Sequence, residues 1–173
     1  MMNRRTFLAI TASSLALVGR RRLSAEPLGH DDLIASISKQ TLWQNRDGLG
    51  TTWFHPRACM IPAPQGRSTA LMTLQAITGS DYFGPVHLSV SENRGRTWSE
   101  PTPVPPLGQI AVPGHEGLRA GVCDVVPEYH PPTNTVLAMG HVVFYRGAKF
   151  STSDQLARYP VYAVRRADGS WGE

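Results

Sequence analysis

Residues 85–100 read PVHLSVSENRGRTWSE, and residues 160–173 read PVYAVRRADGSWGE. Each stretch is a short apolar, partly alternating run that leads into a polar turn containing Gly, which predicts two antiparallel strands joined by a tight connection. The second stretch is two residues shorter in its turn. Three pairs of residues come into register when this gap is allowed: Pro85 with Pro160, Asn93 with Asp168, and Trp98 with Trp171. The chain therefore contains an internal repeat, and a repeat governs the architecture.

The repeat extends upstream more weakly. Residues 58–74 parallel residues 122–140, with Cys59 matching Cys123 and Leu71 matching Leu137. Each unit then predicts three short strands and the start of a fourth. The predicted strands cover residues 57–61, 69–77, 85–91 and 97–104 in the first unit, and 121–126, 135–145, 160–166 and whatever follows 171 in the second.

Four antiparallel strands per repeat are typical of a β-propeller blade. Blade one is expected at about residues 50–105 and blade two at about 115–173. A closed ring needs at least four blades, so these sequences predict an all-β, partial β-propeller, about two blades of a probable six-bladed ring. Residues 26–49 form a linker, within which residues 33–43 alternate well enough to be a ring-closing strand. The chain is expected to be incomplete by itself.

The N-terminus does not have the composition of a folded domain. Arg4 and Arg5 precede an apolar run over residues 7–18, and Ser24 and Ala25 offer small residues for cleavage. This pattern resembles a twin-arginine signal peptide, which would occupy residues 1–25 and direct export to the periplasm or beyond. The alternative is a disordered basic N-terminus.

Composition excludes several classes of partner and cofactor. The net charge is +4, but five of the seventeen basic residues lie in the first 22 positions, which leaves twelve against thirteen acidic residues in the rest. A nucleic-acid partner is therefore not expected, nor a membrane contact beyond the export signal. No cofactor and no metal are expected, because no paired-Cys or HExxH signature is present and His55, His115, His130 and His141 lack metal-ligand spacing. Cys59 and Cys123 are expected on separate blades, as small apolar fillers too far apart for a disulfide.

The turn at residues 91–98, SENRGRTW, resembles the Asp-box motif, S-x-D-x-G-x-T-W. An Asx side chain accepts backbone N–H bonds inside such a turn, Gly permits a positive φ, and Trp fills the space between strands. These residues are expected to be structural. They are Ser91, Asn93, Gly95 and Trp98 in the first unit, and Asp168, Gly169 and Trp171 in the second.

Residues 53–62, WFHPRACMIP, followed by residues 79–99, GSDYFGPVHLSVSENRGRTWS, are similar to the first blade of the sialidase (neuraminidase) superfamily, in its exo-α-sialidase-like Asp-box branch. The resemblance covers about residues 50–173 and implies that Arg57 clamps a sugar carboxylate and that Asp81 is the catalytic acid/base. In a four-stranded meander both positions open at the same end, opposite the Asp-box turn. The alternatives are a structural ion pair for Arg57 and a turn-capping role for Asp81.

Three further residues are candidates for substrate binding. Glu116 and Arg119 lie in the loop between the predicted blades, and Asp124 follows Cys123 on an innermost strand. Solvated loop charges and a satisfied core acid are the alternatives. The resemblance implies a glycoside hydrolase that releases terminal sialic or related acidic sugars, with its tyrosine nucleophile and remaining arginines in later blades. A non-catalytic propeller that binds glycan or protein, and a different glycan-active enzyme on the same scaffold, stay open.

Overall fold

The computed structural model describes residues 36–45, 48, 51–63, 68–79, 81–150 and 152–172. The predicted signal peptide, residues 1–25, lies outside the described residues. The chain has two compact parts, residues 1–40 and 41–173, and every strand that the structure describes belongs to the second part. Within the described ranges, no helix is long and apolar enough to cross a membrane.

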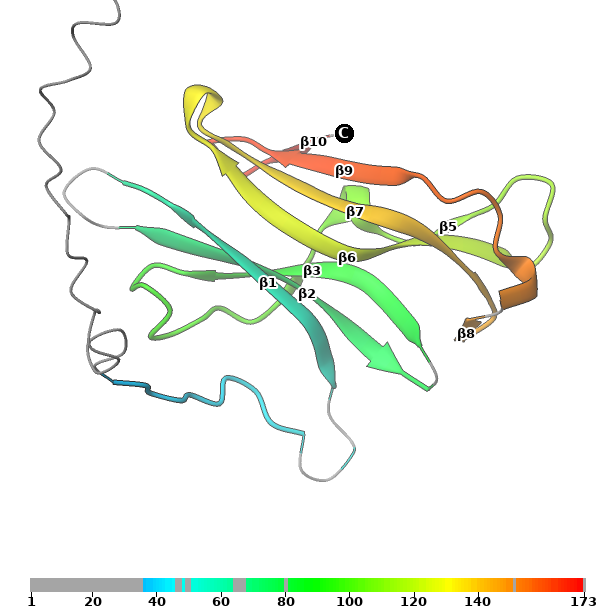
Figure 1. The fold of residues 1–173 in the computed structure, drawn as a ribbon, viewed down its shortest axis with the longest axis horizontal. Coiled ribbons are helices and arrows are strands. Elements are labelled where there is room, and N and C mark those ends of the chain that lie inside the picture. Colours follow the sequence, from blue (N-terminus) through cyan, green and yellow to red (C-terminus); the bar gives the residue numbers. More distant parts are fainter. Residues whose placement is uncertain are drawn as a thin grey trace, which may run out of the picture. The chain divides into compact units, whose positions relative to one another are not determined.

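The strands form two antiparallel sheets, so the all-β prediction is confirmed (Figure 1). The first sheet has the order β1-β2-β3-β4 and the second β10-β9-β7-β6-β5, with β8 paired to β7. The strands of the first sheet are β1 (Trp53–Ile61), β2 (Thr69–Thr78), β3 (Tyr82–Ser91) and β4 (Thr102–Pro103). Those of the second are β5 (Ile110–Ala111), β6 (Leu118–His130), β7 (Thr135–Arg146), β8 (Lys149–Phe150), β9 (Pro160–Arg165) and β10 (Trp171–Gly172).

Each sheet thus contains one four-stranded meander, which we call unit one (β1-β2-β3-β4) and unit two (β6-β7-β9-β10). Three of the turns, β2–β3, β6–β7 and β7–β8, contain a residue that tolerates positive φ. Gly79 (φ 57°) follows β2, Asn134 (φ 52°) precedes β7, and Gly147 (φ 60°) follows β7. Such residues reverse the chain without the strain that a β-branched side chain would meet there.

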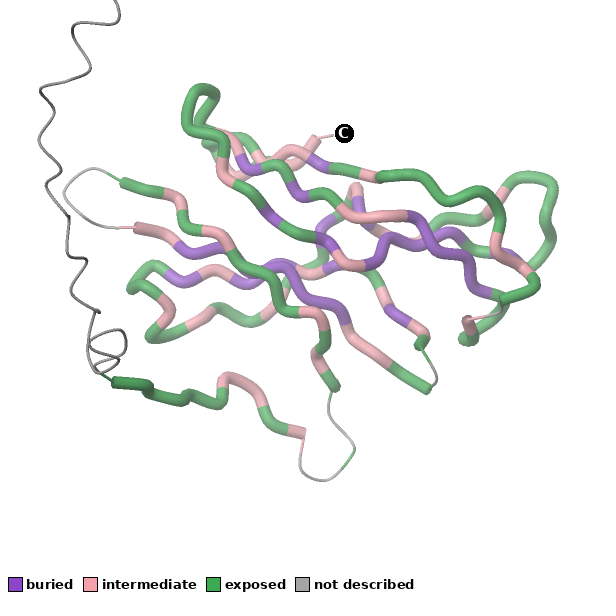
Figure 2. The backbone as a smooth tube through the Cα atoms, in the orientation of Figure 1, coloured by how far each residue is buried: buried purple, intermediate pink, exposed green. Residues whose placement is uncertain are grey.

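The sheets pack through one face of each unit, and this contact holds the core (Figure 2). Leu71 and Val86 from unit one are fully buried, as are Ala138 and Ala163 from unit two. Polar bonds cross the same interface: Thr73 donates to the carbonyl of Val125 at 2.7 Å. The buried apolar side chains and this hydrogen bond together fix how the two units meet.

Gln75 adds a second crossing bond. Its side-chain amide, 2% exposed, donates from Nε2 to the carbonyls of Gly84 and Val122, each at 2.8 Å. A buried amide that serves both its own sheet and the neighbouring one ties β2 to β6.

The opposite face of unit two is open. Val126, Met139 and Tyr162 are register partners across β6, β7 and β9, and they are 46%, 50% and 54% exposed. Leu137, two residues from Met139 and on the same face, is 36% exposed. Alternation along a strand therefore places a buried apolar face and an exposed apolar face back to back.

The turn at residues 91–98 connects β3 to β4 in unit one and contains a dense set of hydrogen bonds. Ser91 Oγ accepts the amide of Gly95 at 2.8 Å, and Asn93 Oδ1 accepts the amide of Thr97 at 2.8 Å. Asn93 Nδ2 also donates to Thr97 Oγ1 at 2.7 Å, and Trp98 Nε1 donates to the carbonyl of Gly95 at 3.1 Å. Gly95 has a φ of 83°. Asn thus closes the turn that the motif usually builds with Asp.

The corresponding turn of unit two, between β9 and β10, is simpler. The hydroxyl of Ser170, and then its amide, which donates to Asp168 Oδ1 at 2.9 Å, hold the pKa of Asp168 below its ordinary value. Gly169 has a φ of 88°, and the half-buried Trp171 packs against the core between the sheets. In unit one the β3–β4 turn lies at the end opposite the β2–β3 connection. In unit two the corresponding turn lies at the end opposite the β7–β9 connection.

Some expectations differ from the structure. The fourth strand of unit one is only Thr102–Pro103, because residues 97–98 are held in the turn rather than in a ladder. The described part of the stretch 33–43, residues 36–43, forms no strand. The two short strands β5 and β8 lie outside the predicted pattern. Cys59 and Cys123 are both free thiols, as expected.

Candidate functional site

Two β-bulges shape one end of the interface between the units. The register of β1 against β2 shifts between Phe54 and Arg57, and the register of β6 against β7 shifts between Cys123 and Val126. Bulges are common beside active sites because they re-aim a side chain. Each of these bulges turns polar side chains toward the other unit.

Three non-glycine residues at this end have left-handed backbone conformations. They are His55 (φ 50°), Asp81 (φ 54°) and Asp124 (φ 54°). His55 also precedes a proline, a position that normally favours extended backbone. Non-glycine residues in this region cost free energy and persist only where surrounding structure demands them. Their grouping around one hollow marks this end as a candidate site.

Gly140 makes the second bulge possible. A Cβ placed on Gly140 would lie 2.5 Å from the carbonyl oxygen of Cys123 and 2.8 Å from a methyl of Val125. The backbone of β7 therefore approaches the bulged backbone of β6 more closely than any side chain allows.

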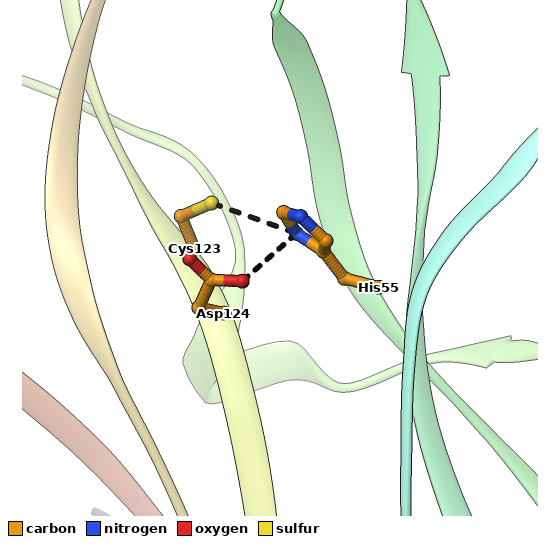
Figure 3. A group of neighbouring side chains, drawn as sticks. All are labelled: His55, Cys123 and Asp124. Carbon is orange, nitrogen blue, oxygen red and sulfur yellow. Dashed lines mark hydrogen bonds and ion pairs between the residues drawn. The ribbon is translucent and has the colours of Figure 1, made fainter.

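The bulges bring His55, Cys123 and Asp124 together (Figure 3). His55 Nδ1 lies 3.2 Å from Asp124 Oδ1 and 3.9 Å from Cys123 Sγ. Arg57 Nη2 lies 3.8 Å from the same Asp124 oxygen. The side chains of Arg57 and Asp124 are both 44% exposed, so this pair is open to solvent.

A cavity of about 300 Å³ opens beside this cluster. Asp81 from unit one and Arg158, which precedes β9, lie in its wall together with His55 and Asp124. Phe83 also lines the cavity. Its ring stacks on that of His55, with centroids 4.8 Å apart, and on that of Phe54, with centroids 5.8 Å apart. The hollow thus combines two carboxylates, a guanidinium and stacked rings.

Tyr145 lines the same cavity from β7. Its side chain is 1% exposed, and its hydroxyl makes no hydrogen bond with the described residues. Burial, and then the neighbouring Cys123, raise the pKa of Tyr145, and the Phe83 backbone offsets only part of this. A buried hydroxyl without a partner costs about 1–3 kcal/mol.

The thiol of Cys123 is protonated at neutral pH. Burial, followed by the negative charge of Asp124, raises the pKa of Cys123 to about 11. Burial also raises the pKa of Cys59, which sits in β1 and packs against the core. Neither thiol has the low pKa of a catalytic nucleophile.

The predicted site residues divide into two groups. Arg57, Asp81 and Asp124 lie at the bulged end, and Asp124 connects Arg57 to the cavity by its charge. Glu116 and Arg119 instead line a separate hollow at the β5–β6 turn. There the carbonyl of Glu116 accepts a bond from Arg146, and Arg119 donates to the carbonyl of Gln109.

Three residues of the cavity went unrecognised in the sequence. In the sequence His55 lacks metal-ligand spacing, Cys123 is predicted to be an apolar filler, and no motif includes Arg158, yet all three line the cavity. The contact between His55 and Cys123 spans 68 positions, so no local spacing reveals it. The dipeptide His55-Pro56 at the start of an apolar run is the one local signal of irregular backbone.

Comparison with known proteins gives no relative for this chain. No protein-family model matches it, and no similar protein was found among curated proteins or solved structures.

Proposed function

We propose that units one and two are neighbouring blades of a β-propeller. Both are four-stranded meanders, and both carry an Asx-closed turn between their third and fourth strands. Unit two covers the apolar face of unit one and itself presents Val126, Met139 and Tyr162 on its open face. In a propeller this face would receive a further blade in the same way.

We further propose that the cavity at the bulged end is a sugar site of a sialidase-like glycoside hydrolase. One observation carries this proposal: Asp81 and Arg158, from different units, line one cavity, and Arg57 adjoins it through Asp124. An arginine recognises a carboxylate by a directional, charge-assisted pair of bonds. Stacked rings such as Phe83 and Phe54 suit the apolar face of a sugar.

The roles divide by position. Asp81, exposed on the β2–β3 turn, is the proposed acid/base, since a carboxylic acid can protonate a glycosidic oxygen. Arg158 and Arg57 are the proposed partners of the sugar carboxylate. Asp124 lies between them and holds Arg57 in place by charge. The protein would then act outside the cytoplasm, consistent with the predicted export signal.

Binding of an acidic sugar is the direct test. Saturation-transfer NMR on the full chain is expected to detect N-acetylneuraminate and not its neutral counterpart N-acetylmannosamine. Arg158→Gln is expected to weaken binding at least about tenfold, the usual scale for losing a charge-assisted pair. Arg119→Gln, in the separate hollow, is the matched control and should leave binding unchanged.

Hydrolysis separates the enzyme from a binding module. A closed propeller that contains this chain is expected to release the fluorophore from a fluorogenic sialoside, and Asp81→Asn is expected to abolish release while sugar binding persists. Binding without release would favour the non-catalytic propeller. Absence of acidic-sugar binding, or equal binding by wild type and Arg158→Gln, would overturn the sugar site.

A further inference from the structure

The side chains of Cys123 and Asp124 point the same way, although they are consecutive residues of one strand. In a regular strand consecutive side chains point to opposite faces. The bulge between Cys123 and Val126, with Asp124 at φ 54°, removes this alternation. Figure 3 shows both side chains turned toward the imidazole of His55, which comes from a bulge in β1.

The three donor atoms converge on one point. His55 Nδ1 is 3.2 Å from Asp124 Oδ1 and 3.9 Å from Cys123 Sγ, and all three donor atoms lie within 4.8 Å of one another. A tetrahedral ion with bonds of about 2.0–2.3 Å holds its ligand atoms roughly 3.3–3.7 Å apart. Small changes in side-chain rotamer are enough to bring the set to that geometry.

We propose that His55, Cys123 and Asp124 form a three-ligand site for a zinc-class transition-metal ion. This inference is independent of the proposed sugar chemistry, because it rests on the donor set alone. Imidazole and thiolate favour Zn²⁺ or Co²⁺, whereas Ca²⁺ and Mg²⁺ take oxygen ligands. The thiolate and the carboxylate together balance the charge of a dication, with Arg57 making only an outer contact to Asp124.

His55, Cys123 and Asp124 all line the cavity, so a fourth coordination position would open onto it. Three protein ligands and one open position are the arrangement of catalytic rather than structural zinc. The site therefore explains two otherwise separate features, the strained bulges of β1 and β6.

Co²⁺ binding to the full chain tests the proposal. Co²⁺ is expected to give a thiolate-to-cobalt charge-transfer band in the near ultraviolet together with intense visible bands of a tetrahedral ion, at one ion per chain. Cys123→Ser is expected to lose the charge-transfer band and to bind more weakly by more than about tenfold, since even outer-shell changes cost that much. Cys59→Ser is the matched control, because Cys59 lies outside the cluster and should keep the full spectrum.

A second measurement needs no variant. Zn²⁺ added to the wild-type chain is expected to slow alkylation of Cys123 and leave that of Cys59 unchanged, as read by peptide mass spectrometry. The proposal is overturned if Co²⁺ gives no thiolate band with the wild-type chain. It is equally overturned if the band survives in Cys123→Ser or if Zn²⁺ protects neither thiol.

Discussion

Units one and two share a strand order but differ in what their faces meet. Leu71 in β2 is fully buried between the sheets, whereas its partner in the sequence repeat, Leu137 in β7, is 36% exposed on the open face of unit two. In unit two the buried positions are instead the flanking Val136 and Ala138. A one-residue difference in phase thus sends equivalent leucines to opposite faces. The repeat preserves the meander and its turns, and contacts with neighbours decide which side becomes core.

The largest test of this contrast compares Leu71→Ala with Leu137→Ala. Leu71→Ala removes a side chain with no exposed surface and is expected to lower the free energy of unfolding by about 3–5 kcal/mol. Leu137→Ala is expected to cost no more than about 1 kcal/mol, since much of that side chain already meets water. Urea unfolding of the full chain measures both, and equal losses would contradict the face assignment.

Gly140 offers a way to break the bulge of unit two while leaving unit one alone. Gly140→Ala drives a methyl group against the backbone of Cys123, so a loss of about 1–3 kcal/mol is expected. His55 and Asp124 should also separate, which NMR of the His55 ring would detect. Gly108→Ala is the control, because the nearest atom to an added methyl there is 3.4 Å away. A fully stable Gly140→Ala chain with an unshifted His55 would refute this account of the bulge.

The β3–β4 turn of unit one and the β9–β10 turn of unit two should differ in their sensitivity to truncation. Asn93→Ala removes the acceptor for the Thr97 amide and the donor to Thr97 Oγ1, so a loss of about 1 kcal/mol is expected. Asp168→Ala removes one exposed bond to Ser170 and should cost less. Asn93→Asp, which keeps the acceptor oxygen, is the conservative control. Thermal unfolding ranks the three, and a larger loss at Asp168 than at Asn93 would reverse the comparison.

The smallest effect concerns pH and only the turn of unit two. The bonds from Ser170 hold the pKa of Asp168 below its ordinary value of 3.8 in the folded chain. The resulting stabilisation is therefore present above the unfolded pKa and is lost as the pH falls through the folded pKa. Asp168→Asn should remove this pH dependence, seen as a difference from wild type in unfolding midpoint that shrinks below pH 3.8. A difference that grows in acid would show the opposite sign of shift.

The strands were predictable because their signals are local. Residues 69–77, 135–145 and 160–166 were predicted, and β2, β7 and β9 begin at the expected residues and end within one residue of the expected ends. Alternation and Gly or Asn turns are sufficient for that. β1 begins four residues earlier than expected, because the ladder resumes beyond the bulge that contains Pro56.

The site was only partly predictable, because part of it depends on contacts that local sequence signals do not show. Arg57 and Asp81 were predicted at one end because meander geometry fixes which connections share an end, and Asp124 was predicted from its place on an innermost strand. His55 and Cys123 were missed because a period of two assigns Cys123 and Asp124 to opposite faces. A bulge is a departure from that period, and its partner strand lies far away in sequence. Only the three-dimensional pairing reveals the cluster.

Gly140 influences the cluster of His55, Cys123 and Asp124 although it is not one of its members. Its missing side chain leaves room for the carbonyl of Cys123, and that carbonyl belongs to the bulge that turns Asp124 toward His55. A lineage that acquired any larger residue at position 140 would have to straighten β6, and would lose the cluster without altering one of its members. Among related chains, a glycine at this position should therefore be inherited together with the histidine, the cysteine and the aspartate.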